Sequence, residues 1–242
     1  MAGELFNLFK KRKEEKIFND KPKMVEYKHI VGICIPGARE FISTESAFSF
    51  MGLSCPNGVG RVMTSKDVQP INHCRNLMVQ ETLLANDKVT HILMLEPDVK
   101  LNPGTLWELF SFEGDIISVP VFDALAPHSP NIYKSETEKM IDFDKVEDKK
   151  IRYRDMYATD PGCVLIKKQL FEDLGVGYFK YDDDYKKSDM FSFCERARKR
   201  NYTLRTTTQL WCHRMAHTEI SYRYFKEFRE YEERKKSDNQ TI

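Results

Sequence analysis

Short apolar runs along the first half of the chain predict buried β-strands. The clearest runs span residues 30–35 (IVGICI), 91–95 (HILML) and 115–121 (DIISVPV), and each is too short for an ordinary helix. Residues 72–86 and 105–112 lie between these runs and space their apolar side chains as helices do. Strands that alternate with helices predict a parallel sheet, with a ligand crevice where the strands end.

The second half of the chain has a more mixed pattern. Residues 158–166 predict a glycine turn followed by a strand, and residues 203–212 predict a final pair of strands. Ser188 is a good N-cap, so we expect a helix to begin at Asp189. The highly charged residues 136–155 predict an exposed hairpin or flap.

Two of the predicted helices have a recognisable apolar face. In the helix over residues 72–86, the side chains expected on this face are Leu77, Met78, Leu84 and Ala85. In the helix that begins at Asp189, they are Met190, Phe193, Cys194 and Ala197. We expect each helix to bury that face.

Composition divides the chain into three parts. Residues 1–28 form a basic leader, in which one apolar helical face precedes the run KKRK. Residues 29–217 hold the predicted strands and helices in a single domain, and residues 218–242 form a charged C-terminal helix or tail. The leader either contacts an anionic membrane or a partner through residues 1–18, or forms a solvated and partly disordered helix.

Charge and cysteine content narrow the functional classes. The 242 residues include 38 Lys and Arg and 37 Asp and Glu, and this balance gives no reason to expect a nucleic-acid partner. Six cysteines occur without a CxxC pair, and Cys34, Cys163 and Cys194 lie in apolar stretches, which favours reduced core thiols. No apolar run approaches the ~20 residues that span a bilayer. We therefore expect a cytoplasmic protein, with the leader as its candidate membrane contact.

Candidate chemistry begins with two acids that follow the strand over residues 91–95. Glu96 and Asp98 flank Pro97, which cannot donate to a strand ladder and so ends the strand. Two carboxylates on one turn can hold a hard divalent cation, which prefers oxygen ligands. The alternative is an exposed acidic turn without a ligand.

Three more residues have both a functional and a structural interpretation. Arg75 lies near the start of its helix, where the helix dipole disfavours a cation, so either an anionic ligand or a neighbouring carboxylate must compensate it. Asp189 is either a functional carboxylate or an acid that only follows the Ser188 cap. His213 is either a ligand or a core histidine, and His217 competes with it as a ligand.

The order of these features resembles a known family. INHCRNLMVQETL followed by THILMLEPDVKLNPGTLWEL is similar to the stretch of family-2-like, nucleotide-sugar-dependent glycosyltransferases in which an RN helix precedes the DxD strand. ATDPGCVLIKKQLFEDL resembles the glycine-turn strand of that family. SDMFSFCERARKRNYTLRTTTQLWCHR resembles its ED-x-x-F-C-x-R-A segment with a trailing histidine. The resemblance covers residues 29–217. It implies the α/β GT-A fold, with a Rossmann-like mixed, mostly parallel central sheet flanked by helices in a single domain.

The resemblance also implies a metal and a donor site. Asp98, with Glu96, would bind Mn²⁺ or Mg²⁺ at the diphosphate of a nucleoside-diphosphate sugar, and His213 would be a further ligand. An imidazole ligand suits Mn²⁺ better than Mg²⁺, so Mn²⁺ is the preferred ion. A cation there would stabilise the charge on the departing diphosphate.

For the nucleotide itself, the resemblance implies contacts from two further places. Arg75, with Asn76, would contact the nucleotide or its diphosphate. The turn at Pro36 and Gly37 would cradle the base and ribose.

On the acceptor side, the resemblance assigns Gly162 to the lining and Asp189 to the general base. Two positions depart from the family pattern: Glu96 stands where Asp is usual, and Ser188 stands where Glu is usual. Asp182–Asp184 lie nearby and are candidates to replace the missing acid.

These features predict a metal-dependent glycosyltransferase that transfers a sugar to a hydroxyl with inversion. The acceptor would be a glycan, a lipid-linked molecule or a protein. The alternative is a catalytically degenerate GT-A module that binds a nucleotide-sugar or glycan, or that acts as a scaffold. A nucleotidyltransferase would need a phosphate loop rich in lysine and glycine near Gly37, and the sequence has none there.

Overall fold

The computed structural model describes residues 28–37, 42–123, 128–141, 152–181, 186–215, 219–220, 226, 229, 230 and 233. The predictions for the leader, for Asp182–Asp184, for His217 and for most of residues 218–242 fall outside these ranges. None of the helices in the described ranges is long and apolar enough to cross a membrane.

In the described residues, seven strands form the central sheet and five helices flank it. The strands are β1 (His29–Pro36), β2 (Val59–Lys66), β3 (His91–Leu95), β5 (Ile116–Val119), β7 (Tyr153–Asp155), β9 (Cys163–Lys167) and β10 (Leu204–Thr207). The helices are α2 (Thr44–Met51), α3 (Ile71–Ala85), α4 (Thr105–Phe110), α5 (Lys168–Leu174) and α6 (Asp189–Arg198).

The order of strands in this sheet is β2-β1-β3-β9-β5-β10-β7. β1, β2 and β3 are parallel, and β5 is parallel to β10. β9 is antiparallel to both β3 and β5, so all five of the other core strands run in one direction, and β7 closes the edge antiparallel to β10. The predicted mixed, mostly parallel sheet is therefore confirmed.

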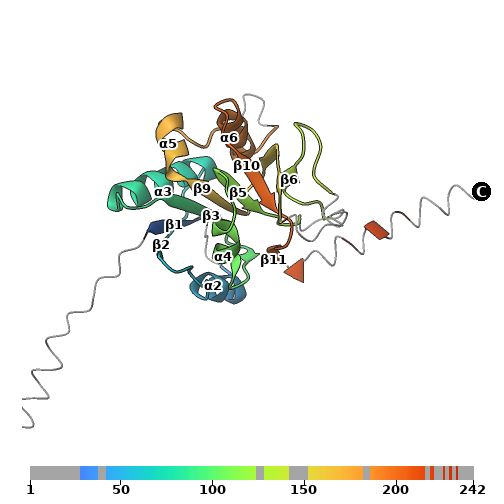
Figure 1. Ribbon diagram of the computed structural model, residues 1–242, viewed down its shortest axis with the longest axis horizontal. Helices are drawn as coiled ribbons and strands as arrows, with labels where there is room; N and C mark the ends of the chain where they lie inside the picture. Colours follow the sequence, from blue (N-terminus) through green and yellow to red (C-terminus); the bar gives the residue numbers. More distant parts are fainter. Residues whose placement is uncertain are drawn as a thin grey trace, which may run out of the picture.

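Helices cover both faces of the sheet (Figure 1). α3, α5 and α6 pack on one face over a core that includes Met78, Phe171 and Phe193. α2 and α4 pack on the other face, where Phe50 and Leu106 belong to a second core. The sheet is buried on both sides, which is why its central strands are continuous apolar runs rather than alternating ones.

Two small sheets complete the described fold. β4 (Val99–Lys100), β11 (His213–Met215) and β12 (Glu219–Ile220) form one, and β6 (Ile132–Tyr133) and β8 (Ala158–Thr159) form the other. The pairing of β4 with β11 brings the acidic turn and the C-terminal segment together, although more than a hundred residues separate them.

The apolar face predicted for α6 is confirmed, because all four of its predicted residues are buried. The face predicted for α3 is wrong in part: Met78 is buried as predicted, but Leu84 is 86% exposed. The buried residues Cys74, Met78 and Thr82 of α3 are spaced four residues apart, with Arg75 and Val79 beside them. A pattern that counts only apolar residues misses a face that contains a threonine and an arginine.

The charged segment over residues 136–155 is in part a strand, because its end forms β7 on the edge of the central sheet. Of this segment, residues 142–151 lie outside the described ranges. The cysteines predicted to act as core residues, Cys34, Cys163 and Cys194, are fully buried thiols.

Candidate functional site

The predicted site residues lie near the carboxyl ends of β1 and β3, where β9 begins. We call this end of the strands the carboxyl edge of the sheet. Cys34 of β1 lies opposite Met94 of β3, and Pro36 and Glu96 each follow this pair by two residues. The Glu96 N–H donates to the Gly162 carbonyl at 2.9 Å. Turns at this edge are therefore tied to one another by the sheet register.

A buried arginine joins two of the predicted acids. One terminal nitrogen of Arg75 (Nη1) donates to both carboxylate oxygens of Asp189 at 2.7 Å, and the other (Nη2) donates to Oε1 of Glu96 at 2.7 Å. Arg75 is 3% exposed and Asp189 is 1% exposed. The structure thus brings together residues that are 114 positions apart in the sequence.

The carboxylates of Asp189 and Glu96 compensate the positive charge of Arg75 near the start of α3. Burial by itself lowers the pKa of Arg75, but the neighbouring charges of Asp189 and Glu96 outweigh burial, so the net shift of the pKa is upward. Of the two interpretations that the sequence left open, the structure shows pairing with carboxylates of the same chain. Contact between Arg75 and a nucleotide stays a prediction.

Asn76 has a structural role that the sequence did not indicate. Its amide nitrogen donates to the Phe179 carbonyl at 2.9 Å, and its amide oxygen accepts from the Phe179 N–H at 2.9 Å. These two hydrogen bonds have the pattern of a residue pair in a β-ladder, and they connect the segment after α5 to the start of α3. Its predicted contact with a nucleotide is untested.

Glycines at this edge are needed for two reasons. Gly37 adopts φ +66°, in the left-handed region, and its N–H donates to the Lys66 carbonyl at 2.8 Å. Gly162 lies so close to Val121 and Asn131 that a Cβ would be 2.8 Å from a side-chain atom of each. Neither position tolerates a larger residue without a local shift.

The three predicted metal ligands differ in their surroundings. Oε1 of Glu96 is held by Arg75, and Oδ2 of Asp98 lies 3.5 Å from Nε of Arg214. His213 lies on β11 opposite Lys100. Within the described part of the chain, no group of three or more His, Cys, Asp or Glu residues is arranged to hold a metal ion.

Asp98 has one feature that suits a cation. Its Oδ1 is buried and accepts no hydrogen bond from the described residues. Its backbone carbonyl accepts from the Met215 N–H at 2.6 Å, which keeps β11 beside it. Mg²⁺ is usually held by one or two carboxylates together with substrate phosphates, and Asp98 fits such an ion. One oxygen of Glu96 is engaged by Arg75, and its role as a metal ligand stays a prediction.

Sequence reasoning missed a further acid at this edge. Asp160 precedes Gly162 by two residues, and its carboxylate accepts hydrogen bonds from Ser188 at 2.6 Å and from Tyr133 at 2.7 Å. Burial raises the pKa of Tyr133, and the hydrogen bond to Asp160 raises it further. The sequence signal was weak, because an acid before Pro-Gly is typical of turns.

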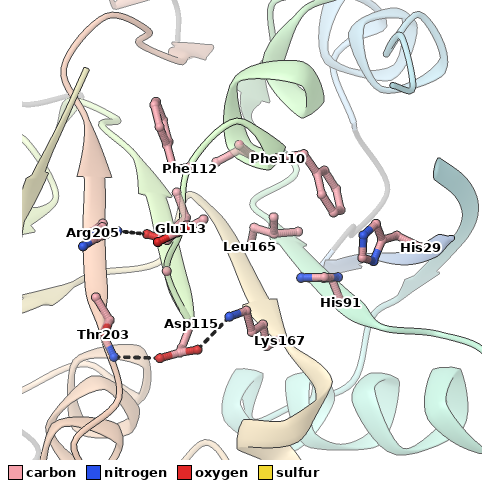
Figure 2. A pocket seen from close by; sticks show the side chains of 13 residues that line it. His29, His91, Phe110, Phe112, Glu113, Asp115, Leu165, Lys167, Thr203 and Arg205 are labelled. Carbon is pink, nitrogen blue, oxygen red and sulfur yellow. Dashed lines mark hydrogen bonds and ion pairs between the residues drawn. The ribbon is translucent and has the colours of Figure 1, made fainter. Parts of the chain in front are cut away.

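A cavity of about 540 Å³ lies at the opposite edge of the sheet (Figure 2). Its lining includes His29 and His91, the first residues of β1 and β3, together with Phe110. Lys167 Nζ donates to Asp115 at 2.9 Å across its floor. This cavity is separate from the predicted site, because parallel strands begin there instead of ending.

Comparison with known proteins gives only the fold. No family model and no curated protein matches the chain. Among solved structures, A197 from STIV is similar at a TM-score of 0.50 and 13% identity, over 78% of this chain and 86% of that one.

Two enzymes are similar at lower scores. The catalytic domain of Drosophila β1,4-galactosyltransferase 7, in complex with xylobiose, has a TM-score of 0.46 and 14% identity over 76% of this chain and 69% of its own. Residues 1–349 of S. aureus TarS, in complex with UDP, have a TM-score of 0.44 and 10% identity over 76% of this chain and 59% of that chain. At these identities a likeness concerns the path of the chain and not its chemistry.

Proposed function

We propose that this protein is a glycosyltransferase, which transfers a sugar from a nucleoside-diphosphate sugar to an acceptor hydroxyl with inversion. The observation that carries the proposal is the convergence of Arg75, Glu96 and Asp189 at the carboxyl edge of a mostly parallel sheet. In open α/β sheets, ligands bind outside the carboxyl ends of the strands. The ordered motifs that resemble family-2-like enzymes support this proposal, because they imply a donor-site role for Arg75 and Glu96 and a general-base role for Asp189.

The donor would lie along the turn at Pro36 and Gly37. The Gly37 N–H is already used by Lys66, so the glycine contributes a close approach of the backbone rather than a donor. The resemblance assigns Gly162 to the acceptor side, and there Val121 and Asn131 fill the space that a side chain at this position would take.

Asp98 would hold the divalent cation together with the diphosphate oxygens, and His213 lies on the strand beside it. When bound, the ion would offset the negative charge of the diphosphate leaving group. Asp98 also fixes β11 through its carbonyl. The backbone of Asp98 is therefore held by both β4 and β11, and this rigidity suits a residue that binds a ligand.

The test is a thermal-shift screen of UDP, GDP, CDP and ADP, with and without Mn²⁺. Binding to the folded state stabilises it by about 2.7 kcal/mol when the ligand is at 100 times its Kd, so the favoured nucleotide raises the unfolding midpoint. We expect one nucleotide to be favoured, and we expect Mn²⁺ to increase its effect. Asp98→Asn should remove the Mn²⁺ increment, and no shift with any nucleotide would contradict the proposal.

One observation favours a second candidate, a module that binds a nucleotide-sugar without transferring it. Asp189, which the resemblance assigns to the general base, is buried and has both oxygens on Arg75. The two functions differ in turnover. Release of free nucleoside diphosphate from a sugar donor, together with formation of a glycoside, would exclude the binding module.

A further inference from the structure

Four of the described acidic residues belong to the proposed site at the carboxyl edge of the sheet: Glu96, Asp98, Asp160 and Asp189. The carboxylates of three of them lie within 3.5 Å of an arginine nitrogen. Asp160 is the exception, because its carboxylate contacts two neutral hydroxyl groups. Asp160 can therefore take up a proton without disturbing an ion pair with arginine.

Asp160 is half-buried, and both of its carboxylate oxygens accept hydrogen bonds. The Ser188 hydroxyl donates to Oδ1 at 2.6 Å, and the Tyr133 hydroxyl donates to Oδ2 at 2.7 Å. Each carboxylate oxygen has two lone pairs, so each keeps one for another donor. The Ser188 hydroxyl is itself held, since it accepts from the Phe191 N–H at 3.0 Å.

The backbone of Asp160 is also fixed. Its N–H donates to the Asn131 carbonyl at 2.8 Å, and its carbonyl accepts from the Asn131 side-chain amide at 3.0 Å. The amide oxygen of Asn131 accepts in turn from the Val121 N–H at 2.9 Å. Two residues later, the Gly162 carbonyl accepts from Glu96. Asp160 is therefore held rigidly within the proposed site, as a group that acts on a substrate must be.

Asp189 is also fixed, but it is not accessible to an acceptor. Both of its oxygens accept from Arg75, one of them also accepts from the Met190 N–H, and the residue is 1% exposed. An acceptor hydroxyl cannot reach it in this arrangement. Protonation of Asp189 would also remove a charge that balances a buried guanidinium, which is costly in a site of low polarity.

We propose that Asp160, and not Asp189, is the general base of the transfer reaction. This inference rests on the proposed function. The hydroxyl oxygen of the acceptor forms a bond to the anomeric carbon, and the bond from that carbon to the diphosphate oxygen breaks. The electron pair of the broken bond leaves with the diphosphate, and the hydroxyl proton passes to a carboxylate oxygen of Asp160.

Ser188 and Tyr133 then act as positioning residues. They orient the two oxygens of Asp160 and stabilise its charged form by donating to it. The serine that replaces the usual acid before Asp189 thereby has a role, because its hydroxyl both caps α6 and holds Asp160.

The test compares two acceptors in variants of the full chain. Azide is an anion and needs no base, whereas an alcohol must lose its proton to one. With a donor that the wild type turns over, from a panel of UDP-glucose, UDP-N-acetylglucosamine and GDP-mannose, Asp160→Asn should lower transfer to an alcohol by about 10²- to 10⁴-fold. Its transfer to azide should stay within about threefold of wild type.

Two variants serve as controls. Tyr133→Phe removes one hydroxyl from Asp160 and should slow transfer to the alcohol more than transfer to azide, with a smaller effect than Asp160→Asn. Asp155→Asn makes the same chemical change on the exposed edge strand β7 and should leave both rates unchanged. Thermal midpoints show whether each variant is folded.

The outcomes separate the two proposals. If the wild type transfers sugar and Asp160→Asn keeps most of its activity with the alcohol, the assignment of Asp160 is wrong and the proposed function stands. An equal loss with alcohol and azide also overturns the assignment, because it indicates a role in structure or donor binding. If the wild type transfers sugar from no donor to either acceptor, both proposals fail.

Discussion

At the scale of single residues, His91 shows how burial changes a titrating group. Its ring lies 5.0 Å from the ring of Phe110 and 5.5 Å from that of His29, between centroids. Burial, then the charges of His29 and Lys167, lower the pKa of His91 from 6.5 to about 4. The folded protein therefore keeps this imidazole neutral at a pH where the unfolded chain protonates it.

The direction of the pH effect follows from linkage. Between pH 6.5 and about 4, the unfolded state binds a proton at His91 that the folded state does not, so the free energy of unfolding falls as the pH falls. His91→Phe keeps a ring against Phe110 and removes the titration. We expect the wild type to lose roughly 2 kcal/mol more than the variant between pH 7 and pH 5 in urea unfolding.

Parallel pH dependence in the two proteins would contradict the assigned cause. His29 contributes in the same direction, because burial and then Lys28 lower its pKa. The double variant His29→Phe/His91→Phe should accordingly have an even flatter profile than His91→Phe.

At the scale of elements, α3 packs unusually close to β1. A Cβ on Gly32 of β1 would overlap the Cγ2 methyl of Thr82 on α3 and would lie 3.0 Å from Cδ1 of Ile92. The Thr82 hydroxyl lies 3.5 Å from the Cys34 sulfur and 3.4 Å from the Thr64 hydroxyl. This close approach sets the position of α3, and with it the position of Arg75.

Gly32→Ala should therefore destabilise the protein by about 1–3 kcal/mol, because overpacking forces the helix outward. Thr82→Ser removes the methyl group and keeps the hydroxyl. We expect Gly32→Ala/Thr82→Ser to be more stable than the sum of the two single changes predicts. Chemical denaturation of the four proteins of this cycle measures that coupling.

Gly104→Ala is the matched control for this cycle. Gly104 has φ −82°, and a Cβ there would meet nothing within 4 Å. Its free energy of unfolding should change by no more than about 0.5 kcal/mol. Equal effects of alanine at Gly32 and Gly104 would show that the contact with Thr82 does not limit the packing of α3.

At the scale of the whole molecule, the strands of the central sheet differ in how well their backbone amides are shielded from solvent. β3 has a neighbour on each side and is buried on both faces, whereas β2 and β7 each pair on one side only. The proposed site and the cavity lie at opposite edges of this sheet.

Hydrogen exchange tests this arrangement directly. We expect the amides of β3 and β9 to exchange only through global unfolding, and those of β7 to exchange at least about 100-fold faster, through local opening. Mass spectrometry of peptides that cover each strand measures the difference. Slow exchange in β7 equal to that of β3 would mean that the edge strand is part of the most stable unit.

Most of the fold could be predicted from local patterns. The apolar runs at residues 30–35, 91–95 and 115–121 are strands β1, β3 and β5, and Ser188 caps α6 as expected. These features depend on a few neighbouring residues, through periodicity, caps and turn-forming residues. The sequence alone also placed Glu96 directly after a buried strand.

Only the tertiary structure decided which charges meet. It paired Arg75 with Glu96 and Asp189, and it left Asp160 with two hydroxyls. Which charged side chains meet depends on the order of the strands and the positions of the helices, which join residues more than a hundred positions apart. Patterns among neighbouring residues in the sequence cannot predict such contacts. For the same reason, the sequence could suggest the carboxylates of a site but could not show which of them is free to accept a proton.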